Sequence, residues 1–146
     1  MDKEKPIIIG SDHAAFELKE KIKAYLLQKG FQVEDAGTNS IASVSYVEYG
    51  KKVAKAVSKG RFSRGILLCG TGLGMSMVAN RFQNVRAALC SDIFSAKMSR
   101  VHNDSNILVL GGRILGDVLA FELVQTWLET GFEGGRHLER IQSMDA

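Results

Sequence analysis

The sequence has little proline, few cysteines and no long apolar run, and each shortage excludes a class of protein. It contains one proline, two cysteines and fifteen glycines among 146 residues, with 45% hydrophobic and 24% charged residues. This composition is typical of a globular chain with tight turns and argues against disorder. No apolar stretch approaches the roughly 20 residues that a membrane span needs. We therefore expect one domain, residues 1–146, without a membrane partner.

An excess of one charge is also missing. The formal net charge is +3, and no run of lysine or arginine occurs, which argues against a nucleic-acid partner while it suits a small anionic ligand. Cys69 and Cys90 both end apolar, strand-like segments. A disulfide between neighbouring strand ends is conceivable, but no secretory signal precedes the chain, so we expect the reducing cytoplasm.

Short apolar segments alternate with longer amphipathic ones. The alternation predicts an α/β three-layer αβα sandwich with a five-stranded parallel, doubly wound sheet. Residues 131–146 follow a glycine-rich break, and we expect a C-terminal tail helix there that packs on the body or on a second subunit. The expected strands are 6–10, 30–35, 65–69, 86–90 and 106–110, and the expected helices are 16–27, 46–59, 74–81, 93–102 and 117–130.

Polar clusters follow several of these segments. They read GSDH at 10–13, CGTGLGMS at 69–76 and HND at 102–104. In parallel α/β sheets, ligands bind beyond the carboxyl ends of the strands. We therefore expect the clusters to converge on one site at that edge.

Gly70, Gly72 and Gly74 lie between an expected strand and helix. Glycines there let backbone N–H groups approach an anionic ligand closely. The loop is not a P-loop, and it departs from G-x-G-x-x-G because Met75 occupies the third glycine position. Asp92 lies at the distance of a ribose-binding carboxylate, so a dinucleotide site stays open as an alternative. A second alternative also stays open: the glycines serve only to allow a tight turn between the strand and the helix.

Cys69 stands at the mouth of this glycine loop. A thiol near a helix N-terminus tends to have a lowered pKa, and a thiolate can act as a nucleophile or a general base. The alternative is a small buried hydrophobic residue, which is how we interpret Cys90. The residues alone leave both interpretations of Cys69 open.

The motifs GSDHAA, CGTGLGMS, RVHNDSN and EGGRHLER follow one another in register from about residue 7 to 140. In this combination the chain resembles the type B ribose-5-phosphate isomerases, whose wider family includes the galactose-6-phosphate isomerase subunits. The resemblance implies a Rossmann-like fold and the interconversion of D-ribose 5-phosphate and D-ribulose 5-phosphate without a metal or organic cofactor. It also implies a homodimer with active sites shared between subunits, and dimers that can pair into a tetramer.

The resemblance also implies catalytic roles. Cys69 would move the proton from C2 to C1 of the sugar, through a cis-enediolate. The N–H groups of Gly70, Gly72 and Gly74 would stabilise that anion in the manner of an oxyanion hole. Thr71 and His102 would open the sugar ring, and Asn103 would hydrogen-bond the sugar. For His102 alone, the alternative is a histidine at the C-terminus of a helix, interacting with its dipole.

Binding roles follow in the same way. The resemblance makes Asp12 a contact to a sugar hydroxyl, a role compatible with capping the next helix, and it gives Tyr46 a place against the sugar. The phosphate ligands would be His13, Arg113, Arg136 and Arg140. Arg136 and Arg140 share one face if the tail is helical, and a monomer should be nearly inactive. Each arginine by itself could equally be a solvated surface charge.

The chain departs from the family pattern in places. Ser45-Tyr46-Val47 stands where much of the family has Asp-Tyr-Pro, which puts the geometry of that loop in doubt. Met75 stands where one branch has its catalytic glutamate, so the chain follows the cysteine branch. The retained cysteine–histidine pairing favours a five-carbon substrate. An isomerase of allose 6-phosphate or galactose 6-phosphate stays an alternative, as does a non-catalytic module that binds a nucleotide or a sugar phosphate.

Overall fold

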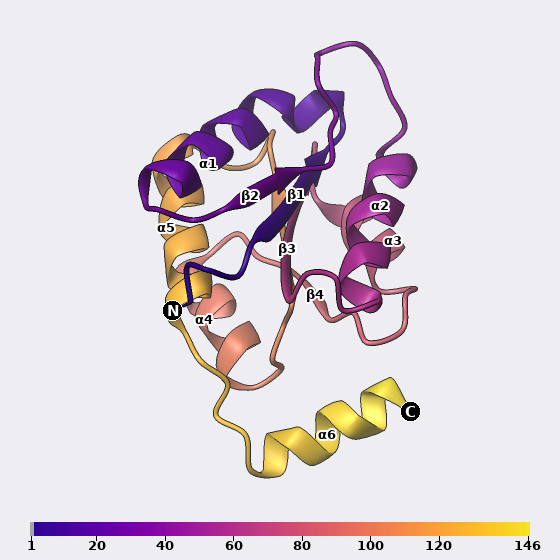
Figure 1. The fold of residues 1–146 in the computed structure, drawn as a ribbon, viewed down its shortest axis with the longest axis vertical. Helices are drawn as coiled ribbons and strands as arrows, with labels where there is room; N and C mark the ends of the chain where they lie inside the picture. Colours follow the sequence, from indigo (N-terminus) through magenta and orange to yellow (C-terminus); the bar gives the residue numbers. More distant parts are fainter. Residues whose placement is uncertain (1) are drawn as a thin grey trace.

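The computed structural model describes residues 2–146 and contains one five-stranded parallel sheet in the order β2-β1-β3-β5-β4 (Figure 1). The sheet confirms the predicted fold class. The doubly wound pattern did not specify that β5 lies between β3 and β4. The strands are β1 Ile7–Ser11, β2 Val33–Asp35, β3 Arg64–Cys69, β4 Ala87–Leu89 and β5 Ile107–Gly111.

Helices cover both faces of the sheet, as a three-layer sandwich requires. In Figure 1, α1, α4 and α5 lie on one side and α2 and α3 on the other. A short 3₁₀ helix, η1, leads from β1 into α1. The bounds are η1 His13–Ala15, α1 Phe16–Gln28, α2 Tyr46–Ser58, α3 Leu73–Ala79, α4 Ile93–Val101, α5 Asp117–Glu129 and α6 Arg136–Asp145.

The central strand β3 shows how the sequence builds two cores. Side chains alternate between the faces of a strand. Ile66 and Leu68 pack toward α1, α4 and α5, whereas Leu67 and Cys69 pack toward α2 and α3. Cys69, the last residue of β3, is therefore held by a buried strand at the edge where the polar loops begin.

β2 is shorter than predicted, because Gly30 and Phe31 close α1 instead of pairing with β1, and the first bond to β1 comes from Ile7 N–H to Gln32 O at 2.9 Å. Gly30 has a φ of +92°, and its N–H donates to the carbonyl of Leu27. The N–H of Phe31 donates to Leu26 O, which completes a glycine-based helix end. Phe31 is buried under the helix.

The tail forms the predicted helix, α6, which lies at the opposite end of the molecule from the carboxyl ends of the strands (Figure 1). Buried Ile141 and an ion pair hold it to the body: Arg86 Nη1 lies 2.8 Å from Asp145 Oδ2. Among residues 2–146, no helix combines the length and apolar character that crossing a membrane requires.

Candidate active site

A cavity of about 360 Å³ opens beyond the carboxyl ends of β1 and β3. This is the edge at which parallel sheets bind ligands. Every lining residue except Ala14 is a predicted site residue. The walls are Asp12, His13, Ala14, Tyr46, Cys69, Gly70, Thr71, Gly74 and Arg113. The clusters at 10–13 and 69–76 therefore converge as expected.

Cys69 is 5% exposed and lies at the wall of this cavity. Its Sγ accepts a hydrogen bond from the N–H of Gly72, with 3.2 Å between the two atoms. Gly72 has a φ of +81°, and a Cβ on it would lie 2.5 Å from Leu89 Cδ1. Gly72 thus orients the sulfur and lies outside the cavity lining, whereas Gly70 and Gly74 form part of that lining.

Arg113 reaches the cavity because the loop after β5 is hydrogen-bonded to the loop after β3. The N–H of Gly112 donates to Cys69 O at 2.8 Å, and the N–H of Arg113 donates to Gly70 O at 2.9 Å. The arginine is thereby fixed one loop away from the thiol. Its guanidinium places a positive charge in a cavity that also holds a carboxylate and an imidazole.

Asp12 and His13 come from the turn after β1. Asp12 Oδ1 accepts the N–H of Ala15 at 3.3 Å, so the carboxylate caps η1 as its alternative role predicted, while it also lines the cavity. His13 Nδ1 lies 3.1 Å from the N and 3.2 Å from the O of Val44. Either protonation state of Nδ1 therefore finds a backbone partner, which orients the ring toward the cavity.

Tyr46 begins α2, and its ring packs directly against Gly74. A Cβ on Gly74 would lie 2.6 Å from Tyr46 Cε2. Ser45 caps α2, because its side-chain oxygen accepts the N–H of Val47 at 3.2 Å. A proline at position 47 could not donate this bond, so the cap depends on the valine that stands in place of the proline of the Asp-Tyr-Pro pattern.

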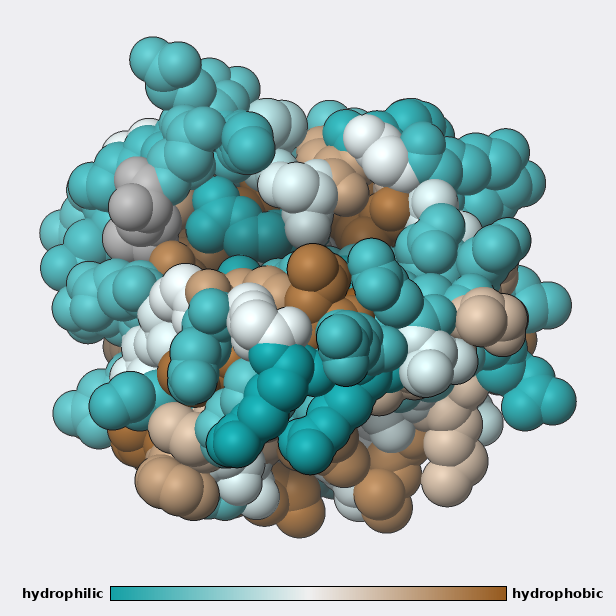
Figure 2. All heavy atoms as spheres, turned by 90° about the horizontal axis from the view of Figure 1, so that it is seen from below, coloured by the Kyte–Doolittle hydropathy of each residue, from teal (hydrophilic) through white to brown (hydrophobic). Residues whose placement is uncertain are grey.

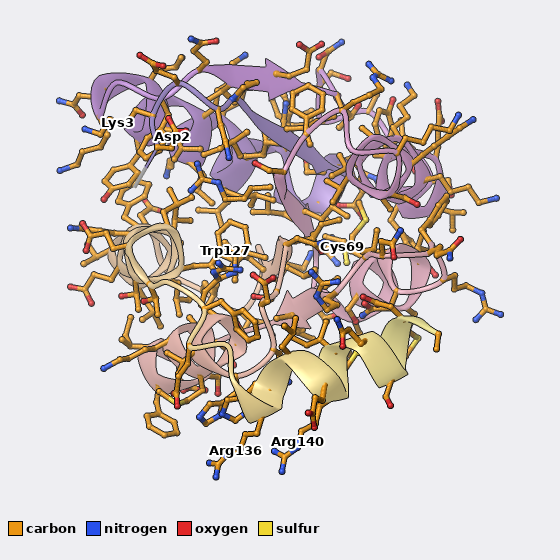
Figure 3. The ribbon with its side chains drawn as sticks, turned by 60° about the horizontal axis from the view of Figure 1, so that its bottom comes forward. Asp2, Lys3, Cys69, Trp127, Arg136 and Arg140 are labelled. Carbon is orange, nitrogen blue, oxygen red and sulfur yellow. The ribbon has the colours of Figure 1, made fainter. Side chains whose placement is uncertain are left out.

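The remaining predicted site residues lie at the other end of the molecule. His102 follows α4, which runs back along the sheet, so it lies at the amino edge of the strands. The expectation that residues 102–104 converge with the other clusters within one chain is therefore wrong. Arg136 and Arg140 share one face of α6, as predicted, and Figure 3 shows both pointing away from the body and from Cys69.

Around α6 the surface is mixed. Figure 2 shows hydrophilic side chains over most of this face, with hydrophobic side chains exposed between them. Leu138 and Met144 of α6 are 46% and 61% exposed. A cavity of about 620 Å³ lies beneath the helix, and its lining includes Asn103 and Met144. This larger cavity contains no thiol and lies away from the glycine loop.

His137 was missed by the sequence analysis. It is 4% exposed, its ring stacks on that of exposed His102 with 4.5 Å between centroids, and its Nε2 has no hydrogen-bond partner among residues 2–146. Burial, and then the neighbouring His102, lower the pKa of His137. The missed signal is the spacing of His137 and Ile141, which places both on the buried face of an otherwise polar helix.

The structure removes the support for a Cys69–Cys90 disulfide and for a dinucleotide site that uses Asp92. Cys69 and Cys90 are both free, and burial raises the pKa of Cys90 to about 11, so this thiol stays protonated. Asp92 caps α4: Oδ1 accepts the N–H of Ser95 at 2.7 Å, and the bonds from Ser95 lower the pKa of this carboxyl. A helix cap explains the acidic residue that suggested a dinucleotide site.

Curated relatives cover nearly the whole chain. Ribose-5-phosphate isomerase B of Escherichia coli is 45% identical over 142 residues, which are 97% of this chain and 95% of the relative. The D-erythrulose-4-phosphate isomerase of Pectobacterium atrosepticum is 41% identical over 94% of this chain and 91% of its own. The 4-deoxy-4-sulfo-D-erythrose isomerase of a Clostridium species is 43% identical over 86% and 80%. Related chains thus act on different sugars.

Solved structures agree with this relationship. A ribose 5-phosphate isomerase from Thermotoga maritima is 56% identical, with a TM-score of 0.94 and 97% of both chains covered. Ribose-5-phosphate isomerase B from Mycoplasma genitalium, solved with bound ribulose-5-phosphate, is 38% identical, with a TM-score of 0.91 and 95% and 93% covered. The model of the Ribose/Galactose Isomerase family matches residues 7–144. The chain therefore belongs to the ribose/galactose isomerase family.

Proposed function

We propose that the protein is a cytoplasmic aldose–ketose isomerase that interconverts D-ribose 5-phosphate and D-ribulose 5-phosphate as a homodimer. The observation that carries the proposal is the position of Cys69. Its sulfur lies at the wall of a cavity whose lining also includes a carboxylate, an imidazole, a hydroxyl, a phenol and a guanidinium. These are the groups that a proton-transfer reaction on an anionic sugar needs.

The phosphate end of the substrate would bind to His13 and Arg113, which contribute N–H donors and positive charge. Arg136 and Arg140 lie too far away in the same chain to take part. We assign them to the site of a second copy, where their shared face would grip the phosphate from the other side. The exposure of both arginines on α6 supports this assignment.

Ring opening comes first. His102 from the second copy and Thr71 would shuttle protons: the C1 hydroxyl loses its proton, the bond from C1 to the ring oxygen breaks, and that oxygen gains a proton. The product is the open-chain aldehyde. Histidine suits this step because its ordinary pKa lies close to neutrality.

Isomerisation follows at C1 and C2. Cys69, as the thiolate, would remove the C2 proton, leaving a cis-enediolate whose negative charge faces the N–H groups of Gly70 and Gly74. The thiol then returns the proton to C1, while the hydroxyl proton of O2 passes to O1, which leaves a ketone at C2. A backbone donor of this kind typically contributes about 3–4 kcal/mol to lowering the barrier.

The test is a substrate panel in deuterium oxide. Purified protein is given four-, five- and six-carbon aldose phosphates, and kcat/KM and deuterium incorporation are measured for each. We expect ribose 5-phosphate to give the highest kcat/KM, with solvent deuterium appearing at C1 of the ketose. A higher value for a four- or six-carbon phosphate would reassign the substrate, and binding without turnover or label would make the protein a non-catalytic module.

A further inference from the structure

His102, Glu133 and His137 bring three possible metal ligands together on the α6 side of the molecule. One ligand atom from each residue lies within 4.8 Å of the others. Two imidazoles and one carboxylate form the donor set of three-ligand zinc sites, in which water takes the fourth position. This cluster lies apart from the cavity around Cys69.

The backbone holds this cluster in place. The N–H of Glu133 donates to Val101 O at 3.1 Å, which fixes Glu133 beside the end of α4, where His102 lies. Gly134 and Gly135 then take φ values of +74° and +58° and turn the chain into α6. The N–H of His137 donates to Gly134 O at 3.2 Å. Glu133 and His137 therefore both lie beside His102.

His137 supplies an independent indication of a ligand. It is 4% exposed, and its Nε2 is buried without a hydrogen-bond partner among residues 2–146. Buried polar atoms normally have a partner, and an orphaned one calls for an explanation such as an ion. A neutral imidazole nitrogen is a common ligand of divalent transition metals.

The present geometry is that of an open site. The rings of His102 and His137 are stacked with an interplanar angle of 23°, whereas tetrahedral zinc with bonds of about 2.0–2.1 Å holds two nitrogens about 3.3 Å apart. The lone pair of an imidazole nitrogen lies in the plane of its ring, so two nearly parallel, stacked rings cannot both direct one at the same ion, and binding must break the stack. His102 and Glu133 are exposed and free to turn, while His137 is held by burial. The neighbouring charges of Arg136 and Arg140 oppose a cation, so binding should be reversible.

We propose that His102, Glu133 and His137 bind one divalent transition-metal ion of the zinc type, and that the ion withdraws His102 from catalysis. The proposal that this cluster binds a metal rests on the arrangement of the three residues alone. The inhibitory half rests on the proposed function, because a lone pair that holds a metal is no longer available to move a proton during ring opening. The bound ion would act as a reversible inhibitor of the isomerase.

Binding is tested by zinc titration against a chromogenic chelator, using the full-length protein. We expect one ion per chain, with affinity at least about tenfold weaker in Glu133→Gln, since even indirect changes at metal sites cost about 10–100-fold. Glu139→Gln, an exposed change on α6 outside the cluster, should bind as the parent does. Equal affinity in Glu133→Gln would overturn the proposal, as would loss of binding in Cys69→Ser, which would place the metal on the thiol.

Inhibition is tested separately on ribose 5-phosphate. Zinc should inhibit the parent protein, EDTA should restore turnover, and Glu133→Gln should need about ten times more zinc for the same inhibition while its metal-free rate is unchanged. Stoichiometric binding without inhibition would overturn the inhibitory half. A protein that binds zinc but shows no isomerase activity would contradict the proposed function and leave the metal site standing.

Discussion

Two buried thiols at strand ends show how much the surroundings decide at the scale of a residue. Cys69 and Cys90 are 5% and 2% exposed. Cys69 accepts an N–H from the glycine loop and lines a cavity, whereas burial keeps Cys90 protonated with a pKa of about 11. The glycine loop that follows Cys69 in the sequence already distinguished the two cysteines, but the residues alone left the role of Cys69 open, because that role depends on the cavity that its sulfur lines.

Replacing Cys69 tests its assigned role. Cys69→Ser should reduce kcat by about 10²–10⁴-fold, since an alkoxide is not available as the base at neutral pH, and substrate affinity should change little. The measurement is steady-state turnover of ribose 5-phosphate together with its dissociation constant. Cys90→Ala is the matched control and should retain most of the activity. Near-normal turnover in Cys69→Ser would remove the thiol from the mechanism.

Gly74 tests the packing of Tyr46. In Gly74→Ala the new Cβ would lie 2.6 Å from the Tyr46 ring, so the ring must move and we expect kcat/KM to fall by about 10–100-fold, as displacement of a positioning group can do. In Gly70→Ala the Cβ meets Arg113 Cδ at 3.5 Å, an ordinary contact, and kcat/KM should fall much less. Equal losses in the two variants would contradict this account.

At the scale of elements, the central strands were predictable because short, unbroken apolar segments between amphipathic ones indicate strands that are covered on both faces. β3 and β5 begin and end within a residue of the predicted bounds, and Gly30 and Gly60, which follow two of the predicted helices, have positive φ. The position of residues 102–104 was not predictable in this way. These residues follow a helix that runs back along the sheet, so they lie at the amino edge of the strands rather than at the carboxyl edge. Sheet order was also beyond the pattern, which does not specify strand neighbours.

β2 is tied to the cavity through the partly buried carboxylate of Asp35. Asp35 Oδ1 lies 2.7 Å from Nζ of Lys19, which is fully buried, and accepts the N–H of Gly37 at 2.9 Å. Gly37 O in turn accepts the N–H of Ser11 at 2.8 Å, next to Asp12. The pair therefore supports the turn from which two cavity residues come.

Asp35→Asn should lower the free energy of unfolding by about 3 kcal/mol, because it leaves the Lys19 charge buried with only Glu20 nearby. The measurement is urea unfolding at a fixed protein concentration. Asp117→Asn removes an exposed carboxylate, 2.9 Å from Lys21 Nζ, and should change stability by about 0.5 kcal/mol or less. Equal losses of unfolding free energy in Asp35→Asn and Asp117→Asn would contradict a larger contribution from the Lys19–Asp35 pair.

The same pair predicts a pH dependence. Burial alone would raise the pKa of Asp35, but hydrogen bonds from Lys19, Gly37 and Lys23 outweigh it and hold the pKa below its ordinary value. As the pH falls, Asp35 therefore binds its proton in the unfolded chain before it does so in the folded chain. The contribution is complete above the unfolded pKa of about 3.9 and is lost as the pH falls through the folded value. Asp35→Asn should lose less stability on acidification than the parent protein; an identical loss would contradict the assignment.

At the scale of the whole molecule, the candidate site residues are divided between two opposite ends of the folded molecule. Cys69, Thr71 and Arg113 line the cavity at one edge of the sheet, whereas His102, Arg136 and Arg140 lie at the other. Large apolar side chains are exposed outside the core, with Met77 66%, Phe94 71% and Val118 72% accessible. A second copy would complete the site.

Mixing two inactive variants tests this division most directly. Cys69→Ser and Arg136→Ala should each be nearly inactive as homodimers, measured as turnover of ribose 5-phosphate. After the two are mixed and allowed to exchange subunits, half of the dimers are mixed, and each has one site with both native residues, so we predict roughly a quarter of parental activity. Mixtures that show subunit exchange but stay as inactive as their components would contradict a site shared between two copies.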